Sequence, residues 1–105
     1  MKKVSLQKMT NLINTHWAPL DVFRVNDFAV RLVKIKGKYI LHKHDGDELF
    51  IVQKGQMIIH LKDRDIDLKK GEGFVVEQGV MHQTEAKEES EVLVIEPSDI
   101  KTITD

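Results

Sequence analysis

The chain has 105 residues and a formal net charge of −1, with 41% hydrophobic and 31% charged residues. Such a length and composition are typical of one globular domain, and the balanced charge, without a basic cluster, argues against a nucleic-acid partner. The absence of cysteine excludes disulfides, thiolate metal ligands and a cysteine nucleophile, so any metal site must use imidazole, carboxylate, amide or water ligands.

No targeting or membrane segment is expected. The N-terminus, MKKVSLQKMT, lacks the apolar core of a signal peptide, and the longest apolar runs, such as VLVI, have only four residues. A transmembrane helix needs about 20 apolar residues. We therefore expect a cytoplasmic protein with no membrane partner.

The first element expected is a helix over residues 5–17. Apolar residues recur there at spacings of three and four, at Leu6, Met9, Ile13 and Trp17. Ser5 is a suitable N-cap, and Pro19 ends the segment. We expect His16 and Trp17 to serve packing, with a lid or a dimer contact as the alternative for Trp17.

From residue 20 onward the pattern changes to short strands. Eight or nine apolar or alternating segments are separated by turn residues, and the charged KEES segment at 87–90 is expected to be a loop. This rhythm predicts an all-β antiparallel sandwich or barrel over residues 20–97, within a single domain spanning 1–105. There is no G-x-S-x-G, P-loop or dinucleotide fingerprint that would indicate a serine hydrolase or a nucleotide-dependent enzyme.

One stretch, GKYILHKHDGDELFIVQKG at 37–55, has the residue types of a metal site. His42 and His44 alternate along one strand and so share a face. Glu48 begins the returning strand and can point to the same face, with Phe50 and Val52 on its side. The alternative is two histidines on a solvated edge strand.

A second stretch, GEGFVVEQGVMHQTEA at 71–86, adds Gly71, Gly79 and His82. Together the two stretches resemble the motifs of the cupin superfamily, G-x5-H-x-H-x3,4-E-x6-G and G-x5-P-x-G-x2-H-x3-N. Three positions depart from these motifs. Gly37 lies one residue closer to the first histidine, Glu77 stands in place of proline, and Ala86 in place of asparagine. None of these positions holds a metal ligand in the family.

The resemblance implies a double-stranded β-helix (jelly-roll) cupin barrel with a short N-terminal helix. It also implies that one divalent metal ion, such as Mn, Fe, Ni or Zn, is bound by His42, His44, Glu48 and His82. In octahedral coordination these ligands would leave two positions open for water, substrate or dioxygen. The alternative is a degenerate cupin in which the same residues form a hydrogen-bonded polar cluster.

The chain resembles the short, single-domain cupins grouped as mannose-6-phosphate isomerase-like. Two functions remain open. One is a metalloenzyme acting on a small polar substrate, with isomerase-like or dioxygenase-like chemistry. The other is a non-catalytic module that binds or senses a small molecule. His60 is a weak candidate for acid–base catalysis, with an inert, partly exposed histidine as the alternative. Cupins of this size often form homodimers, and we expect one here.

Overall fold

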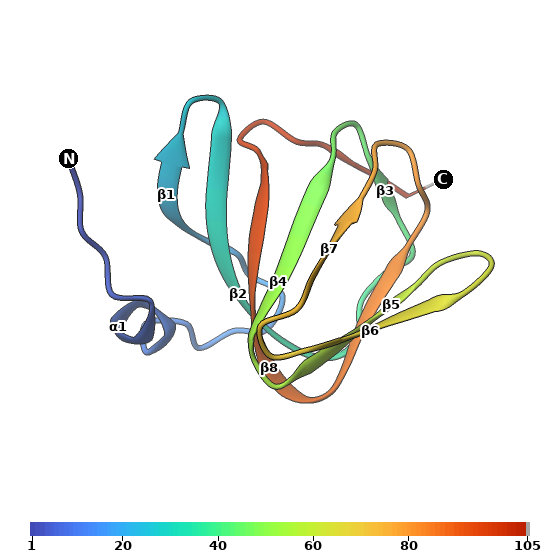
Figure 1. Ribbon diagram of the computed structural model, residues 1–105, viewed down its shortest axis with the longest axis horizontal. Helices are drawn as coiled ribbons and strands as arrows, with labels where there is room; N and C mark the ends of the chain where they lie inside the picture. Colours follow the sequence, from blue (N-terminus) through green and yellow to red (C-terminus); the bar gives the residue numbers. More distant parts are fainter. Residues whose placement is uncertain (105) are drawn as a thin grey trace.

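The computed structural model of the chain describes residues 1–104, and this part of the chain is an all-β jelly roll with one short helix. The helix, α1, spans Leu6–Thr10 and lies outside the barrel (Figure 1). The nine strands are β1 Leu20–Val25, β2 Phe28–Lys38, β3 Lys43–His44, β4 Glu48–Lys54, β5 Gln56–His60, β6 Asp65–Lys69, β7 Gly73–Val76, β8 Gln83–Pro97 and β9 Thr102–Ile103. Their number agrees with the eight or nine strands expected from the sequence.

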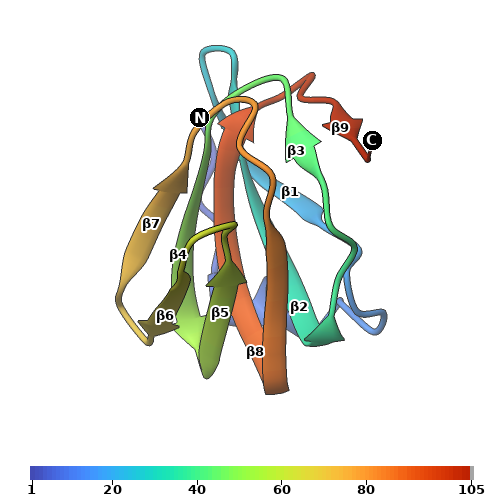
Figure 2. The same cartoon turned by 90° about the vertical axis from the view of Figure 1, so that its right-hand side faces the viewer.

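The strands form one large antiparallel sheet and one small one. The large sheet has the order β1-β2-β8-β4-β7, and β5 pairs with both β8 and β6. The small sheet pairs β3 with β9, on the side of the molecule away from β7 (Figure 2). A bridge between His42 and His82 connects the two, with reciprocal backbone N–H···O distances of 2.9 and 2.8 Å.

The interior is filled by alternate residues of the central strands. In β4, Glu48, Phe50 and Val52 are buried while the residues between them are half-buried. The expectation that Phe50 and Val52 share the side of Glu48 is therefore confirmed. In β8, Val92 and Val94 join the same core from the neighbouring strand. This inward face is apolar at its centre and becomes polar towards one end, where the candidate site lies.

The predicted helix over 5–17 is wrong in length, because α1 ends at Thr10. Its start is as expected, since the Ser5 side chain accepts a hydrogen bond from the backbone N–H of Lys8. Beyond Thr10, bonds to Lys34 of β2 replace helical ones. The Lys34 ammonium donates to the Ile13 carbonyl at 3.0 Å, and the Trp17 N–H donates to the Lys34 carbonyl at 2.9 Å. No helix in residues 1–104 is long and apolar enough to cross a membrane.

The predicted loop over residues 87–90 is also wrong, because these residues lie within β8, a strand of 15 residues. Lys87, Glu88 and Glu89 are all exposed, so their charges remain in contact with water although they lie within the strand. Ser90 is buried, and its hydroxyl donates to the Gln56 carbonyl at 2.9 Å. The β2–β8 register also shifts beside this segment, between Ile35 and Gly37. Charge alone therefore misled the sequence prediction.

Two turn glycines, Gly55 and Gly71, have nearly the same backbone φ angle but different neighbouring atoms. Gly55, between β4 and β5, has φ +86°, and a Cβ there would lie 2.3 Å from the Ser90 hydroxyl oxygen. Gly71 has φ +85°, and a Cβ there would meet nothing within 4 Å. Both positions favour glycine because other residues pay a penalty at such φ values. Only Gly55 is also required by close approach.

We expect Gly71→Ala to lower the free energy of unfolding by about 1 kcal/mol through backbone strain. Gly55→Ala should lower it by about 2–4 kcal/mol, since the added methyl also displaces Ser90. Urea denaturation of both variants beside the parent chain measures the difference. Equal losses in the two variants would show that the contact with Ser90 is unimportant.

Candidate metal centre

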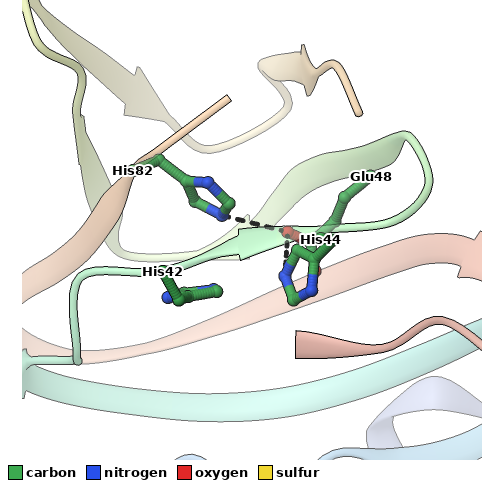
Figure 3. A group of neighbouring side chains, drawn as sticks. All are labelled: His42, His44, Glu48 and His82. Carbon is green, nitrogen blue, oxygen red and sulfur yellow. Dashed lines mark ion pairs between the residues drawn. The ribbon is translucent and has the colours of Figure 1, made fainter. Parts of the chain in front are cut away.

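The four residues singled out in the sequence come together at one end of the barrel interior (Figure 3). His42 and His44 come from β3 and the residue before it, Glu48 begins β4, and His82 immediately precedes β8. All four are buried, with exposed fractions of 4%, 8%, 6% and 0%, respectively. One ligand atom from each lies within 4.8 Å of the others. The alternative of two histidines on a solvated edge strand is thereby excluded.

Local structure explains how the residues converge. His42 and His44 share a face through the two-residue period, and the turn at 45–47 returns the chain so that Glu48 faces them. The Gly79 N–H donates to the His44 carbonyl at 2.9 Å, which ties the loop before His82 to β3. The same loop is held by Asp47, whose carboxylate accepts from the Gln78 N–H at 2.8 Å.

Backbone carbonyls fix the tautomers of all three histidines. The Nδ1 atom of His42 lies 2.8 Å from the Ile40 carbonyl oxygen, and that of His82 lies 2.8 Å from the carbonyl of Val80. The Nδ1 atom of His44 lies 3.3 Å from the Lys101 carbonyl. A carbonyl can only accept, so each Nδ1 carries the hydrogen. In the neutral rings the Nε2 lone pairs are therefore available at the centre of the cluster, as in metal-ligating histidines.

The central atoms have no hydrogen-bond partners. In residues 1–104 the buried, unpartnered side-chain atoms are Thr10 Oγ1, His44 Nε2, Glu48 Oε1 and His82 Nε2, so three of the four belong to this cluster. Buried polar atoms are almost always satisfied, because an unsatisfied one costs about 1–3 kcal/mol. A cation among these atoms would satisfy all three at once.

The spacing fits a small cation. Glu48 Oε1 lies 3.2 Å from His44 Nε2 and 3.4 Å from His82 Nε2. Two ligand atoms that are each about 2.1 Å from one ion lie about 3.0 Å apart at a right angle and about 3.4 Å apart at the tetrahedral angle. Imidazole nitrogen and carboxylate oxygen are ligands that Zn, Fe, Ni and Mn accept. The donor set and these two distances thus suit a divalent first-row ion.

The electrostatics favour a carboxylate facing imidazoles. Burial raises the pKa of Glu48, but the facing imidazoles of His44 and His82 outweigh it and hold that pKa well below its usual range. Burial lowers the pKa of His42, and the neighbouring histidines lower it further. For His44, burial also lowers the pKa, but the facing Glu48 carboxylate leaves it raised. A proton on His44 and a metal ion are therefore alternative ways to satisfy Glu48.

The cluster opens into a cavity of about 240 Å³ inside the barrel. Two lining residues that the sequence reasoning missed are Arg31 and Glu96. The buried Glu96 accepts a hydrogen bond from the Arg31 guanidinium. Burial and the neighbouring carboxylate of Glu48 raise the pKa of Glu96 to about 7, against the opposing effect of Arg31. Alternation with Val92 and Val94 along β8 was the signal that could have placed Glu96 inside.

Residues 31–96 match the family Cupin_2, the cupin domain. This chain belongs to the cupin family. It is similar to the uncharacterized protein YdbB of Bacillus subtilis (strain 168), with 32% identity over 104 residues, which cover 97% of this cupin and 92% of YdbB. The subgroup of mannose-6-phosphate isomerase-like cupins is not distinguished by these matches.

Solved structures share the fold. A cupin-2 domain containing protein from Shewanella frigidimarina NCIMB 400 is 39% identical with a TM-score of 0.87, covering 90% of this cupin and 93% of that chain. Hydroquinone 1,2-dioxygenase from Sphingomonas sp. TTNP3 is 12% identical with a TM-score of 0.73, covering 81% of this cupin and 68% of that chain. At such low identity the second likeness concerns the fold alone.

His60, the weak candidate for acid–base catalysis, does not line the cavity. Its neighbours Met57 and Ile59 are buried, whereas His60 is only half-buried on the outer side of β5. The Nδ1 and Nε2 atoms of His60 lie 2.8 Å from carboxylate oxygens of Asp65 and Glu85, respectively. This arrangement connects β5 with β6 and β8 and serves the stability of the hairpin.

These two carboxylates raise the pKa of His60, mainly through their hydrogen bonds. Because the folded pKa is raised, the stabilisation is fully present below the unfolded pKa of about 6.5 and is lost as the pH rises through the folded value. We expect His60→Ala to lower the thermal midpoint more at pH 6 than at pH 9. In a background of Asp65→Asn and Glu85→Gln this pH dependence should disappear, and a difference independent of pH in the parent chain would contradict the assignment.

Proposed function

We propose that this cupin binds one divalent metal ion through His42, His44, Glu48 and His82 and acts on a small molecule in the adjoining cavity. The observation that carries this proposal is the set of three buried ligand atoms without hydrogen-bond partners, on rings whose Nδ1 atoms face backbone carbonyls. A cluster stabilised only by its own hydrogen bonds would not leave these atoms unsatisfied. The degenerate alternative is therefore less well supported.

When bound, a divalent ion supplies Lewis acidity and open coordination positions for substrate oxygen. The chain supplies the rest. Carbonyls of Ile40, Val80 and Lys101 orient the three rings, and Glu48 provides a negative charge in a buried setting. The buried ring of Phe50 lies beside the cluster, with its centroid 6.3 Å from that of His82, and makes that side of the site apolar. These features favour a catalytic site over a purely structural one.

Two reactions are candidates, isomerase-like carbonyl chemistry and dioxygenase-like cleavage. The identity of the ion narrows the choice, because iron favours dioxygen chemistry while Mn, Ni or Zn leaves isomerisation open. The alternative function is a non-catalytic module that binds a small molecule through the same site. Detection of substrate turnover would distinguish either enzyme from this module. We also propose that the chain forms a homodimer. The edge strand β1, whose last residue Val25 is exposed, offers a surface for the contact.

Elemental analysis of protein purified without chelator tests the metal site. We expect about one ion per chain in the parent protein, retained in His60→Ala and lost in His82→Ala, because only His82 belongs to the cluster. Adding the ion to metal-free protein should raise the thermal midpoint of the parent chain and of His60→Ala, since a ligand bound only by the native state stabilises it. No bound ion, even after reconstitution with excess Zn or Mn, would refute the proposal.

A second prediction concerns the C-terminal segment that orients His44. The Asp45 carboxylate accepts from the Lys101 N–H at 2.8 Å, and this holds the Lys101 carbonyl beside the His44 ring. Asp45→Ala should therefore weaken metal affinity by about 10-fold, a typical effect of losing support for a ligand. Competition with a chromophoric chelator measures it. Asp99→Ala, an exposed residue of the same segment, is the control, and equal affinities in the two variants would contradict this role.

A further inference from the structure

Away from the four metal-site residues, the cavity is lined mainly by apolar side chains. The sheet strands β2, β4, β5 and β8 contribute Val33, Ile35, Phe50, Met57, Val92 and Val94. All six are buried and belong to the main hydrophobic core. A ligand that reaches the candidate metal centre must therefore place most of its surface against carbon, with its polar atoms at the histidine end.

One wall of the cavity is aromatic. Trp17 and Tyr39 both line it, with ring centroids 4.8 Å apart and an angle of 23° between the rings. The Tyr39 ring meets the ring of His42 edge-on at 5.5 Å. The stacked pair thus forms an aromatic wall that extends from the N-terminal segment to the first histidine of the site.

Trp17 is held rigidly in this wall. Its backbone N–H donates to the Lys34 carbonyl at 2.9 Å, and its indole N–H donates to the Lys36 carbonyl at 3.1 Å. Its backbone has φ +62°, a left-handed conformation that is uncommon for a bulky residue. Such outliers persist only where the surrounding structure determines them, often at binding sites. The wall is therefore fixed before a ligand arrives.

The cavity offers no free cation to an anionic substrate. Within residues 1–104, Arg31 is the one lysine or arginine that lines it. The guanidinium of Arg31 donates to Asp21 at 2.8 Å, to Glu96, and to the Ser98 carbonyl at 2.9 Å. Two carboxylates and one backbone carbonyl thus occupy three of its donors, and the charge of Arg31 is already paired. A phosphate in this cavity would lack the charged donors that phosphates require.

The size of the cavity limits the ligand further. Its volume is about 240 Å³. An engineered apolar cavity of about 150 Å³ holds benzene. The space therefore accommodates one ring with a few substituents, and it is below the size range of about 300–1,000 Å³ that is usual for larger ligands.

We propose that the ligand of this cupin is a compact, planar, unphosphorylated molecule of about one ring, with oxygen donors at one end. The ring packs beside Trp17 and Tyr39, and the oxygens face the end of the cavity lined by His42 and His44. The inference rests on the proposed function, because the oxygen donors of the ligand would coordinate the bound ion. It narrows the small polar substrate expected from the sequence to one whose polar atoms are confined to a single edge.

Titration of zinc-loaded protein with catechol and with mannose 6-phosphate tests the inference. Zinc content is measured before the titration. Calorimetry should show catechol binding at least about 10-fold more tightly than the sugar phosphate, a difference set by the apolar wall and the missing cation. Trp17 is the single tryptophan of the chain, so quenching of its fluorescence reports binding inside the cavity. Tighter binding of the sugar phosphate, or no binding of catechol, would overturn the inference.

Variants test the aromatic wall. Trp17→Ala should weaken catechol binding by about 3- to 10-fold, the range expected from loss of an aromatic contact, while Trp17→Phe restores most of it. Tyr39→Leu, at the other ring of the stack, should weaken it as well. Val75→Ala, at an exposed position away from the cavity, is the control. Unchanged catechol affinity in both Trp17→Ala and Tyr39→Leu would refute the role of the wall.

The measured zinc content shows whether the ligand class or the metal site itself has been refuted. Zinc retained at one ion per chain with no preference for catechol would refute the ligand class and leave the metal site standing. Failure to take up zinc at all would refute the proposed function, and this inference with it.

Discussion

The reciprocal pair of backbone hydrogen bonds between His42 and His82 holds the rest of the site together. It joins the segment that leads into β3 to the segment that leads into β8, at the point where the small sheet meets the large one. Because the residues are directly opposite each other, their rings lie close, with centroids 4.4 Å apart. His44 then follows by the two-residue period of a strand. One backbone bridge therefore brings together imidazoles that are far apart in sequence.

The arrangement stabilises a cluster that would otherwise be unfavourable. Four polar side chains are buried in a small volume, and a negative carboxylate faces nitrogen lone pairs whenever the rings are neutral. The barrel tolerates this because each ring is anchored at its other nitrogen by a backbone carbonyl. The rings consequently cannot turn away to find other partners. The free-energy penalty of the unsatisfied polar atoms therefore falls where a bound cation can offset it.

Much of the fold and of the candidate site could be predicted from the sequence. Alternation placed Glu48, Phe50 and Val52 on one side, and the resemblance to the cupin motifs identified the four residues that the structure brings together. Local patterns could not predict the end of α1, because distant bonds to Lys34 of β2 replace the helix after Thr10. Trp17 packs against the main hydrophobic core, as expected, but its place in the cavity wall was not predicted. Its position depends on two carbonyls of β2, which no local pattern encodes.

The residues that line the cavity come from different parts of the chain, and this affects how the ligand preference of such proteins can change. The candidate metal ligands all lie within the stretch that matches the cupin domain, residues 31–96. Trp17, Ile100 and Thr102 also line the cavity but lie before or after this stretch. Exchange of the N-terminal segment alone between such proteins could thus change which molecule is selected, whereas the C-terminal segment must be kept because the Lys101 carbonyl orients His44. One wall of the cavity and the candidate metal ligands are therefore encoded in separate segments, although they share one cavity.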